Sequence, residues 1–163
     1  MAQYTGKVWV LGDDIDTDII IPTEYLALKT IEDMKQYGFS PLRPELAGQI
    51  QPGDIIVAGK NFGCGSSREQ APEVIKALGI PCIIAKSFAR IFYRNALNNG
   101  LLLLEQPELP DVVKEGDTIT VTVNEDVDYN GKKYPIASLP ENLMEIIEAG
   151  GLVKAMRRRN GLD

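Results

Sequence analysis

The chain has 163 residues, of which 44% are hydrophobic, and carries a formal net charge of −6. This acidic balance argues against nucleic-acid binding as its main task, because such binding usually needs a basic surface. The sequence contains two cysteines and no histidine. Ser–His–Asp and Cys–His catalysis by this chain alone are therefore excluded, and two thiolates are too few for an iron–sulfur cluster.

The length predicts one domain over residues 1–163. No apolar run approaches the roughly 20 residues that span a membrane. Residues 1–8 lack the charged and apolar regions of a signal peptide, and two distant cysteines do not form a disulfide framework. We expect a cytoplasmic protein without membrane contact.

The first third of the chain predicts few regular elements. Residues 6–11 are typical of a strand, and the polar turn 12–18 that follows carries four carboxylates. An apolar run then stops at Pro22, and a weakly amphipathic helix is predicted over 30–36. The stretch 39–52 is broken by prolines and predicts a connection without strands.

The middle of the chain alternates strands with helices. Buried strands are predicted over 54–58, 82–85 and 101–104, and the helices between them over 67–78 and 88–98. This order is typical of a small parallel sheet.

The last third changes character. Strict alternation over 117–123 predicts a half-buried strand, and Asn130-Gly131 is a strong hairpin turn. Two short helices are predicted near 140–149 and 151–159. The expected fold is α/β, with a small parallel sheet flanked by helices and a set of antiparallel strands.

The segment 59–69 joins the strand at 54–58 to the helix predicted from residue 67. Gly63 and Gly65 lie in this segment, and glycine lets a ligand approach the backbone closely. The N–H groups at a helix start have no internal partners, and the helix dipole is positive there. The segment therefore predicts an anion site.

Ser66, Ser67 and Arg68 give this turn its chemistry. Either serine is a candidate base or nucleophile whose alkoxide the N–H groups would stabilise, and the guanidinium is a candidate carboxylate clamp. A plainer interpretation is helix capping, with Ser66 and Glu69 as a capping box and Arg68 in solvent. Three glycines around the turn, Gly59, Gly63 and Gly65, favour the ligand site, since an ordinary cap does not need them.

A second loop is expected beside the first. Ligands of open parallel sheets bind beyond the carboxyl ends of the strands, and residues 86–88 also leave such an end. If the two strands are neighbours, Lys86, Ser87 and Arg90 join the same cleft and can meet a polycarboxylate. For each of these three residues alone, capping or solvent exposure is the plainer interpretation.

Three motifs in order resemble one known family. They are Asp16-Thr17-Asp18 followed by Ile21-Pro22, the run from Gly59 to Gln70, and the run from Ala85 to Phe92. With these motifs the chain resembles the small subunits of isopropylmalate isomerases, and it is similar to the swivelling fourth domain of aconitases. The resemblance covers nearly the whole chain and implies one swivelling β/β/α domain.

The resemblance implies a role as one subunit of a heteromeric hydro-lyase in leucine biosynthesis. This enzyme isomerises 2-isopropylmalate to 3-isopropylmalate by dehydration and rehydration. A 4Fe–4S cluster is expected on a separate large subunit, while this chain binds no cofactor or metal and closes over a small dicarboxylic acid as a lid. Activity is expected only with the large subunit, and self-association is expected of the isolated chain.

The resemblance also implies roles for single residues. Ser66 corresponds to the base, Arg68 to the residue that binds a substrate carboxylate, and Ser67 to a contributor to the oxyanion surroundings. Asp18 corresponds to a polar partner near the catalytic groups. Here the chain departs from aconitases, which have histidine where it has Ile19.

Substrate choice is assigned by resemblance to the loop that contains Ala27, Leu28 and Lys29. Homoaconitase-type relatives tend to place an arginine where this chain has Ala27. An apolar wall suits an isopropyl or methyl group and leaves a third carboxylate unpaired, although Lys29 is long enough to reach in. Isopropylmalate is favoured, with dimethylmalate-type and homoaconitate-type substrates as alternatives.

Two further alternatives stay open. The Arg68 site also suits a carboxylate-binding module without catalysis, whereas the acidic balance argues against an RNA-binding role. Cys64, beside Ser66 at a predicted helix start, is either a reactive thiol of low pKa or a small side chain that fits between two glycines.

Overall fold

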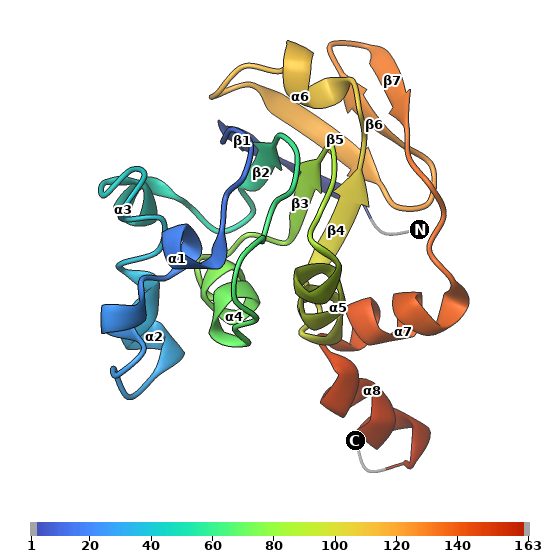
Figure 1. Cartoon of the computed structure of the whole chain (residues 1–163). Helices are drawn as coiled ribbons and strands as arrows, with labels where there is room; N and C mark the ends of the chain where they lie inside the picture. Colours follow the sequence, from blue (N-terminus) through green and yellow to red (C-terminus); the bar gives the residue numbers. More distant parts are fainter. Residues whose placement is uncertain (1–2, 162–163) are drawn as a thin grey trace.

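A computed structural model describes residues 3–161 of the chain. The strands of this part are β1 (Gln3–Val10), β2 (Ile55–Ala58), β3 (Cys82–Ala85), β4 (Leu102–Glu105), β5 (Thr118–Thr122), β6 (Asp126–Tyr129) and β7 (Lys132–Pro135). They form one sheet in the order β4-β3-β2-β1-β5-β6-β7 (Figure 1).

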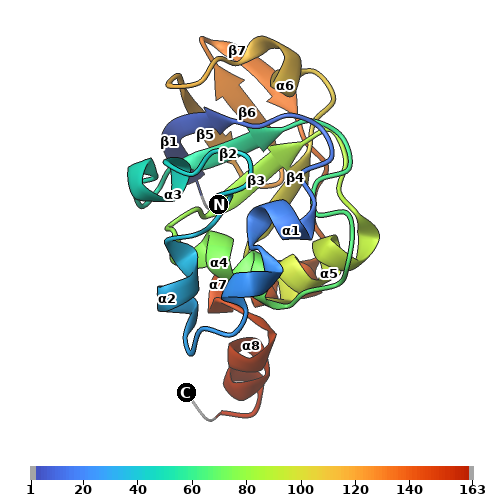
Figure 2. The ribbon, with the colours of Figure 1, turned by 60° about the vertical axis from the view of Figure 1, so that its left-hand side comes forward.

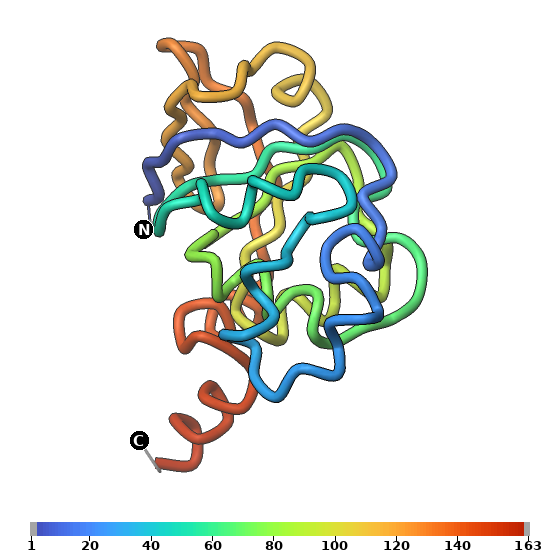
Figure 3. Tube along the Cα trace, turned by 90° about the vertical axis from the view of Figure 1, so that its left-hand side faces the viewer, coloured from blue at the N-terminus to red at the C-terminus, as the bar shows by residue number. Residues whose placement is uncertain are grey.

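The helices are α1 (Thr17–Ile20), the 3₁₀ helix η1 (Thr23–Tyr25), α2 (Ile31–Lys35), α3 (Leu46–Gln49), α4 (Gln70–Ala77), α5 (Arg90–Asn98), α6 (Leu109–Val112), α7 (Glu141–Ala149) and α8 (Leu152–Arg159). In Figure 1, α6 and β7 lie at the top of the molecule, and α4, α5 and α7 lie below the parallel strands. The last helix, α8, extends away from the body (Figure 3). Within the described part of the chain, no helix is both long and apolar enough to span a membrane.

The first strand joins two kinds of sheet. Residues 8–10 of β1 pair in parallel with β2, and residues 3–7 pair antiparallel with β5. Strands β2, β3 and β4 continue the parallel part, and β5, β6 and β7 continue the antiparallel part. The expected combination of a parallel sheet, flanking helices and antiparallel strands is confirmed.

Alternate residues of the parallel strands enter two different cores, because successive side chains point to opposite faces of a sheet. Ile83 packs in a core with Val74 of α4 and Phe92 of α5, which we call the site-side core. Its neighbour Ile84 packs with Val121 of β5 and other residues of the antiparallel strands, in what we call the hairpin-side core. Both isoleucines are fully buried.

Most predicted elements are confirmed, with shifted ends. The hairpin turn forms at Asn130-Gly131, where both residues have positive φ angles of 52° and 84°. The first strand begins earlier than predicted, at Gln3, because pairing with β5 extends it. The 3₁₀ helix η1 was not predicted, and neither were three short α-helices, namely α1 inside the polar turn, α3 inside the stretch 39–52, and α6. Each of these α-helices has four residues, too few for a periodic pattern to show.

Candidate functional site

The loops that follow β2 and β3 run side by side, as their parallel pairing predicts. The Phe62 N–H donates to the Ser87 carbonyl at 3.1 Å, and the Ala89 N–H donates to the Phe62 carbonyl at 2.9 Å. The Asn61 N–H donates to the Ser87 hydroxyl at 2.8 Å. These bonds continue the sheet contact beyond the strands and hold the two loops together.

The polar turn 12–18 forms a third wall of the site. The Gly63 N–H donates to the Ile15 carbonyl at 2.7 Å, and the Thr17 N–H donates to the Cys64 carbonyl at 2.9 Å. The buried hydroxyl of Thr17 donates to the Ser66 carbonyl at 2.8 Å. Figure 2 shows α1 beside the loop that follows β2. The turn thus fixes the backbone at Ser66.

The capping-box interpretation is wrong, and the helix starts three residues later than the predicted residue 67. The helix α4 begins at Gln70, and its N-cap residue Glu69 makes no side-chain capping bond. Gly65 has a φ of 93°, and Thr17 holds the next carbonyl, so the chain enters helical geometry only after Arg68. In the described part of the chain, the hydroxyls and backbone N–H groups of Ser66 and Ser67 have no hydrogen-bond partner. Oriented N–H donors are thus available from the loop, not from the helix start.

Arg68 is held firmly and is not in solvent, since 14% of its side chain is exposed. Its Nη1 lies 2.5 Å from an oxygen of Asp18 and donates to the Ile21 carbonyl at 3.1 Å. Its Nη2 donates to the Thr23 hydroxyl at 2.9 Å. Among the described residues, no acceptor contacts Nε, so Nε and the second N–H of Nη2 remain for a carboxylate.

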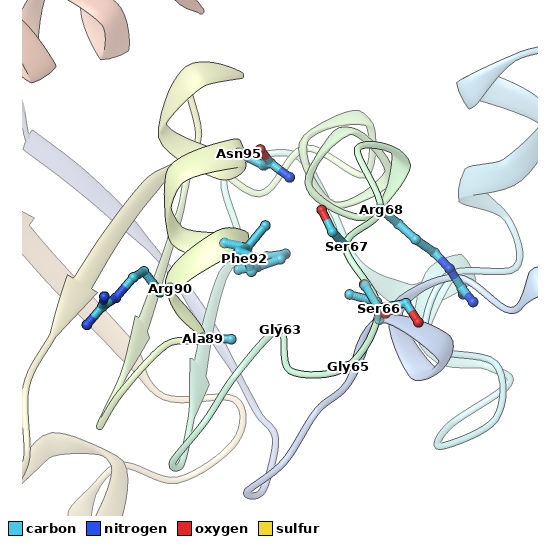
Figure 4. Close-up of a pocket in the computed structure, with 11 residues that line it drawn as sticks. Gly63, Gly65, Ser66, Ser67, Arg68, Ala89, Arg90, Phe92 and Asn95 are labelled. Atoms are coloured by element: carbon cyan, nitrogen blue, oxygen red, sulfur yellow. The ribbon is translucent and has the colours of Figure 1, made fainter.

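The side chains of Ser66 and Arg68 extend to the same side of the turn (Figure 4). The Ser67 hydroxyl points the other way, toward Asn95 of α5. Both serines are exposed. The predicted base and the predicted clamp are therefore presented together, whereas Ser67 faces α5.

A cavity of about 230 Å³ opens beside this turn. The loop 63–68 forms its polar wall, and Ala89, Ile91 and Phe92 form its apolar wall. Ile91 is 58% exposed although it is a large apolar residue. The cavity is smaller than the roughly 300–1,000 Å³ typical of small-molecule sites.

Gly63 and Gly65 are glycines for different structural reasons. Gly63 has a φ of 85°, and a Cβ atom there would overlap the ring of Phe92. Close packing of α5 therefore requires this glycine. At Gly65, also with positive φ, an added Cβ would find its nearest neighbour, in Asp16, at 3.5 Å. Gly65 lines the cavity and leaves its backbone open to a ligand.

Of the three candidate residues that follow β3, only Arg90 lines the cavity. Lys86 forms an ion pair with Asp111 at 2.7 Å, and the Ser87 hydroxyl accepts from the Asn61 N–H. Neither residue lines the cavity. Arg90 does line it, but its side chain points away from Arg68 (Figure 4). Substrate contacts of Lys86 and Ser87 stay predictions.

The predicted specificity segment follows η1 and does not line the cavity. Ala27 and Lys29 are exposed, whereas Leu28 is half-buried against the site-side core. The Tyr25 ring stacks on Tyr37 with 3.9 Å between centroids and fixes the start of the segment. Contact of these three residues with a substrate substituent stays a prediction.

Neither cysteine has the signature of a reactive thiolate. Burial, with the nearby Asp16 and Asp14 carboxylates, raises the pKa of the Cys64 thiol. Complete burial raises the pKa of Cys82 to about 12. The structure therefore favours the packing interpretation of Cys64. The described residues contain no group of three or more histidine, cysteine, aspartate or glutamate side chains placed to hold a metal ion.

The sequence patterns assign no site role to four residues that the structure places at the site: Thr17, Thr23, Ile91 and Asn95. Thr17 lies inside the motif Asp16-Thr17-Asp18, and its hydroxyl is the feature of the sequence that could have indicated a role. Thr23 follows Pro22 at a helix start, where a polar residue is ordinarily an unremarkable cap. Ile91 and Asn95 fit a helical pattern, which cannot tell a cavity wall from a surface.

Comparison with known proteins identifies the class to which this fold and site belong. Residues 23–109 match the aconitase C-terminal domain family. A 3-isopropylmalate dehydratase small subunit of Lachnospira eligens is 78% identical over 161 residues, covering 99% of this chain and 98% of that protein. The chain therefore belongs to the aconitase C-terminal domain family.

Further relatives show to which group within this family the chain belongs. An isopropylmalate/citramalate isomerase small subunit of Methanocaldococcus jannaschii is 46% identical, covering 94% of each chain. A crystal structure of 3-isopropylmalate dehydratase from the same organism superposes with a TM-score of 0.92 at 38% identity, covering 99% of this chain and 97% of that one. Within its family the chain belongs with the 3-isopropylmalate dehydratase small subunits, as the three motifs predicted.

Proposed function

We propose that this chain is the small subunit of a cytoplasmic, heteromeric hydro-lyase that interconverts 2-isopropylmalate and 3-isopropylmalate by dehydration and rehydration, a step of leucine biosynthesis. One observation carries the site assignment. Ser66 and Arg68 extend to the same side of an open turn, and Arg68 keeps donors free for a carboxylate. The names of similar relatives support the reaction.

Ser66 takes the proton from the carbon next to a substrate carboxylate. This step is hard, because a second negative charge builds up on the carboxylate as the proton leaves. Arg68 binds that carboxylate through its free donors and spreads the charge. The unpaired N–H groups of Ser66 and Ser67 stabilise the negative form of the serine hydroxyl. Asp18 contributes by holding Nη1 of Arg68.

The partner is a large subunit that carries the 4Fe–4S cluster. Two cysteines and no histidine do not fit such a cluster, so this chain does not hold it. When bound to the partner, the cluster supplies the Lewis acid for the departing hydroxyl. The small, open cavity of this chain supports the view that a second surface completes the site.

Isopropylmalate is the proposed substrate. The relatives carry isopropylmalate in their names, and the segment with Ala27 and Leu28 offers apolar side chains to an alkyl group. A homoaconitate-type substrate would need a cation for its third carboxylate, and Lys29 is the candidate in this segment. One relative is also named for citramalate, so citramalate belongs in the substrate panel, together with a dimethylmalate.

The test is activity after reconstitution with the large subunit. Turnover of isopropylmalate should exceed that of citramalate, dimethylmalate and homocitrate. Ser66→Ala should lower kcat by about 10²–10⁴-fold with a modest change in KM, since it removes the base. Ser40→Ala, at a serine whose hydroxyl makes no bond within the described residues and which lies outside the cavity, is the matched control.

Two outcomes would contradict the proposal. Full activity of Ser66→Ala would remove the base assignment. Tight binding of isopropylmalate by the isolated chain, unchanged by a large subunit and without turnover, would instead favour a carboxylate-binding module.

A further inference from the structure

We propose that Thr23 is a positioning residue that fixes the plane of the Arg68 guanidinium for the substrate carboxylate. The inference rests on the proposed function, in which Arg68 is the carboxylate clamp. Thr23 belongs to η1 and precedes Arg68 by 45 residues in the chain. Its position in the sequence gave no sign of this contact.

The Thr23 hydroxyl stands between a cation and an anion. It accepts a hydrogen bond from Nη2 of Arg68 at 2.9 Å and donates its proton to the Asp18 carboxylate at 3.3 Å. A threonine hydroxyl has one proton and two lone pairs, so it can serve both charges at once. The bond to the guanidinium is charge-assisted, which makes it stronger than a bond between neutral groups.

The three contacts of Arg68 involve two different nitrogen atoms of its guanidinium. Asp18 and the Ile21 carbonyl hold Nη1, and among the described residues only Thr23 holds Nη2. Nη1 makes one directional hydrogen bond, to the Ile21 carbonyl, beside the Asp18 ion pair, and one directional bond leaves the guanidinium plane free to rotate about it. A contact on the second nitrogen fixes the plane and so directs Nε and the free N–H of Nη2.

A fixed plane matters because a bidentate arginine–carboxylate pair has a specific geometry. If the guanidinium is ordered before the substrate arrives, binding does not have to supply that ordering. Loss of the Thr23 hydroxyl should therefore weaken substrate binding more than it slows the chemical step. Thr23 also begins the segment that leads to Ala27 and Leu28, so it links the clamp to the proposed specificity segment.

The test compares Thr23→Val with Thr23→Ser in the enzyme reconstituted with its large subunit. Thr23→Val keeps the shape and removes the hydroxyl, and we expect KM to rise about tenfold with kcat within about twofold, as loss of a hydrogen bond to a charged group implies. Thr23→Ser keeps the hydroxyl and should restore KM to within about twofold of the unmodified enzyme. Thr118→Val makes the same change at an exposed threonine of β5 and should have no effect.

Arg68→Lys distinguishes failure of the proposed carboxylate clamp from failure of the proposed positioning role of Thr23. If Arg68→Lys leaves KM unchanged, the clamp of the proposed function is wrong. If Arg68→Lys raises KM while Thr23→Val behaves like the unmodified enzyme, only the positioning inference is overturned. Equal KM increases in Thr23→Val and Thr23→Ser would also overturn it, because the hydroxyl would then not matter. If Thr23→Val does not fold, Thr23→Ala removes the same hydroxyl and replaces it in each comparison.

Discussion

The two faces of the parallel strands have equal burial and unequal roles. Ile83 and Ile84 are neighbours, and both are fully buried. Ile83 contributes to the site-side core, which also contains Phe62, Ile15 and Ile21 from irregular loops. Ile84 contributes to the hairpin-side core, which is formed by residues of the antiparallel strands and of α5, α6 and α7.

The difference shows how an irregular site is kept rigid. Each loop that carries the candidate chemistry also places an apolar side chain in the site-side core. Phe62, Ile15 and Ile21 are at most 2% exposed, although the backbone around them forms neither strands nor long helices. Most buried residues of the hairpin-side core lie in strands or helices, and strand pairing with a tight turn sets much of its geometry.

The largest expected effect separates the two cysteines. Cys82 lies in the hairpin-side core with no exposed surface, so its alkylation requires opening of the sheet. At a typical stability of about 5 kcal/mol or more, iodoacetamide should modify it about 10³-fold more slowly than Cys64, as read by peptide mass spectrometry. Cys64 should still react more slowly than a free peptide thiol, because its pKa is raised. Fast labelling of Cys82 would mean that the hairpin side opens readily.

Truncation of the neighbouring isoleucines tests the two faces directly. Ile83→Ala and Ile84→Ala should each lower the free energy of unfolding by about 2–5 kcal/mol, because each leaves a cavity in a packed core. After reconstitution, KM should rise for Ile83→Ala and stay unchanged for Ile84→Ala. Urea unfolding and steady-state kinetics measure the two quantities. Equal effects on KM would show that the faces are not functionally distinct.

Two glycine substitutions give a smaller contrast. Gly63→Ala combines a positive φ with overlap of the Phe92 ring, and should lower the free energy of unfolding by about 2–4 kcal/mol. Gly131→Ala has a similar φ but open space around it, and should cost only about 1–2 kcal/mol. Thermal denaturation measures both. If the two variants are equally stable, α5 must move away from the loop at little cost.

The smallest expected effect concerns an ion pair that joins the two halves of the molecule. Hydrogen bonds from Arg43 hold the pKa of the Glu115 carboxyl below its ordinary value of 4.5. The stabilisation is therefore complete above about pH 4.5 and is lost as pH falls through the lower, folded-state pKa. Both side chains are partly exposed, so Glu115→Gln should cost at most about 1 kcal/mol at pH 7 and nothing at the acid end. A pH-independent difference in urea unfolding would contradict this assignment.

The sequence by itself determined the elements and the motifs. Short continuous apolar runs predicted β2, β3 and β4, strict alternation predicted β5, and Asn130-Gly131 predicted the hairpin, because these signals lie within runs of a few residues. The order of strands and helices then predicted that the loops after β2 and β3 meet. Local glycine and serine chemistry located the candidate site at 63–68.

Only the tertiary structure decided how the side chains of that site are arranged. Arg68 reaches Asp18 and Thr23, Lys86 is directed to Asp111, and Thr17 delays the start of α4. Each of these contacts joins residues far apart in the chain. A local pattern sets backbone conformation within its own few residues, whereas the partner of a charged or hydroxyl side chain depends on which distant segments the sheet register and the cores bring together.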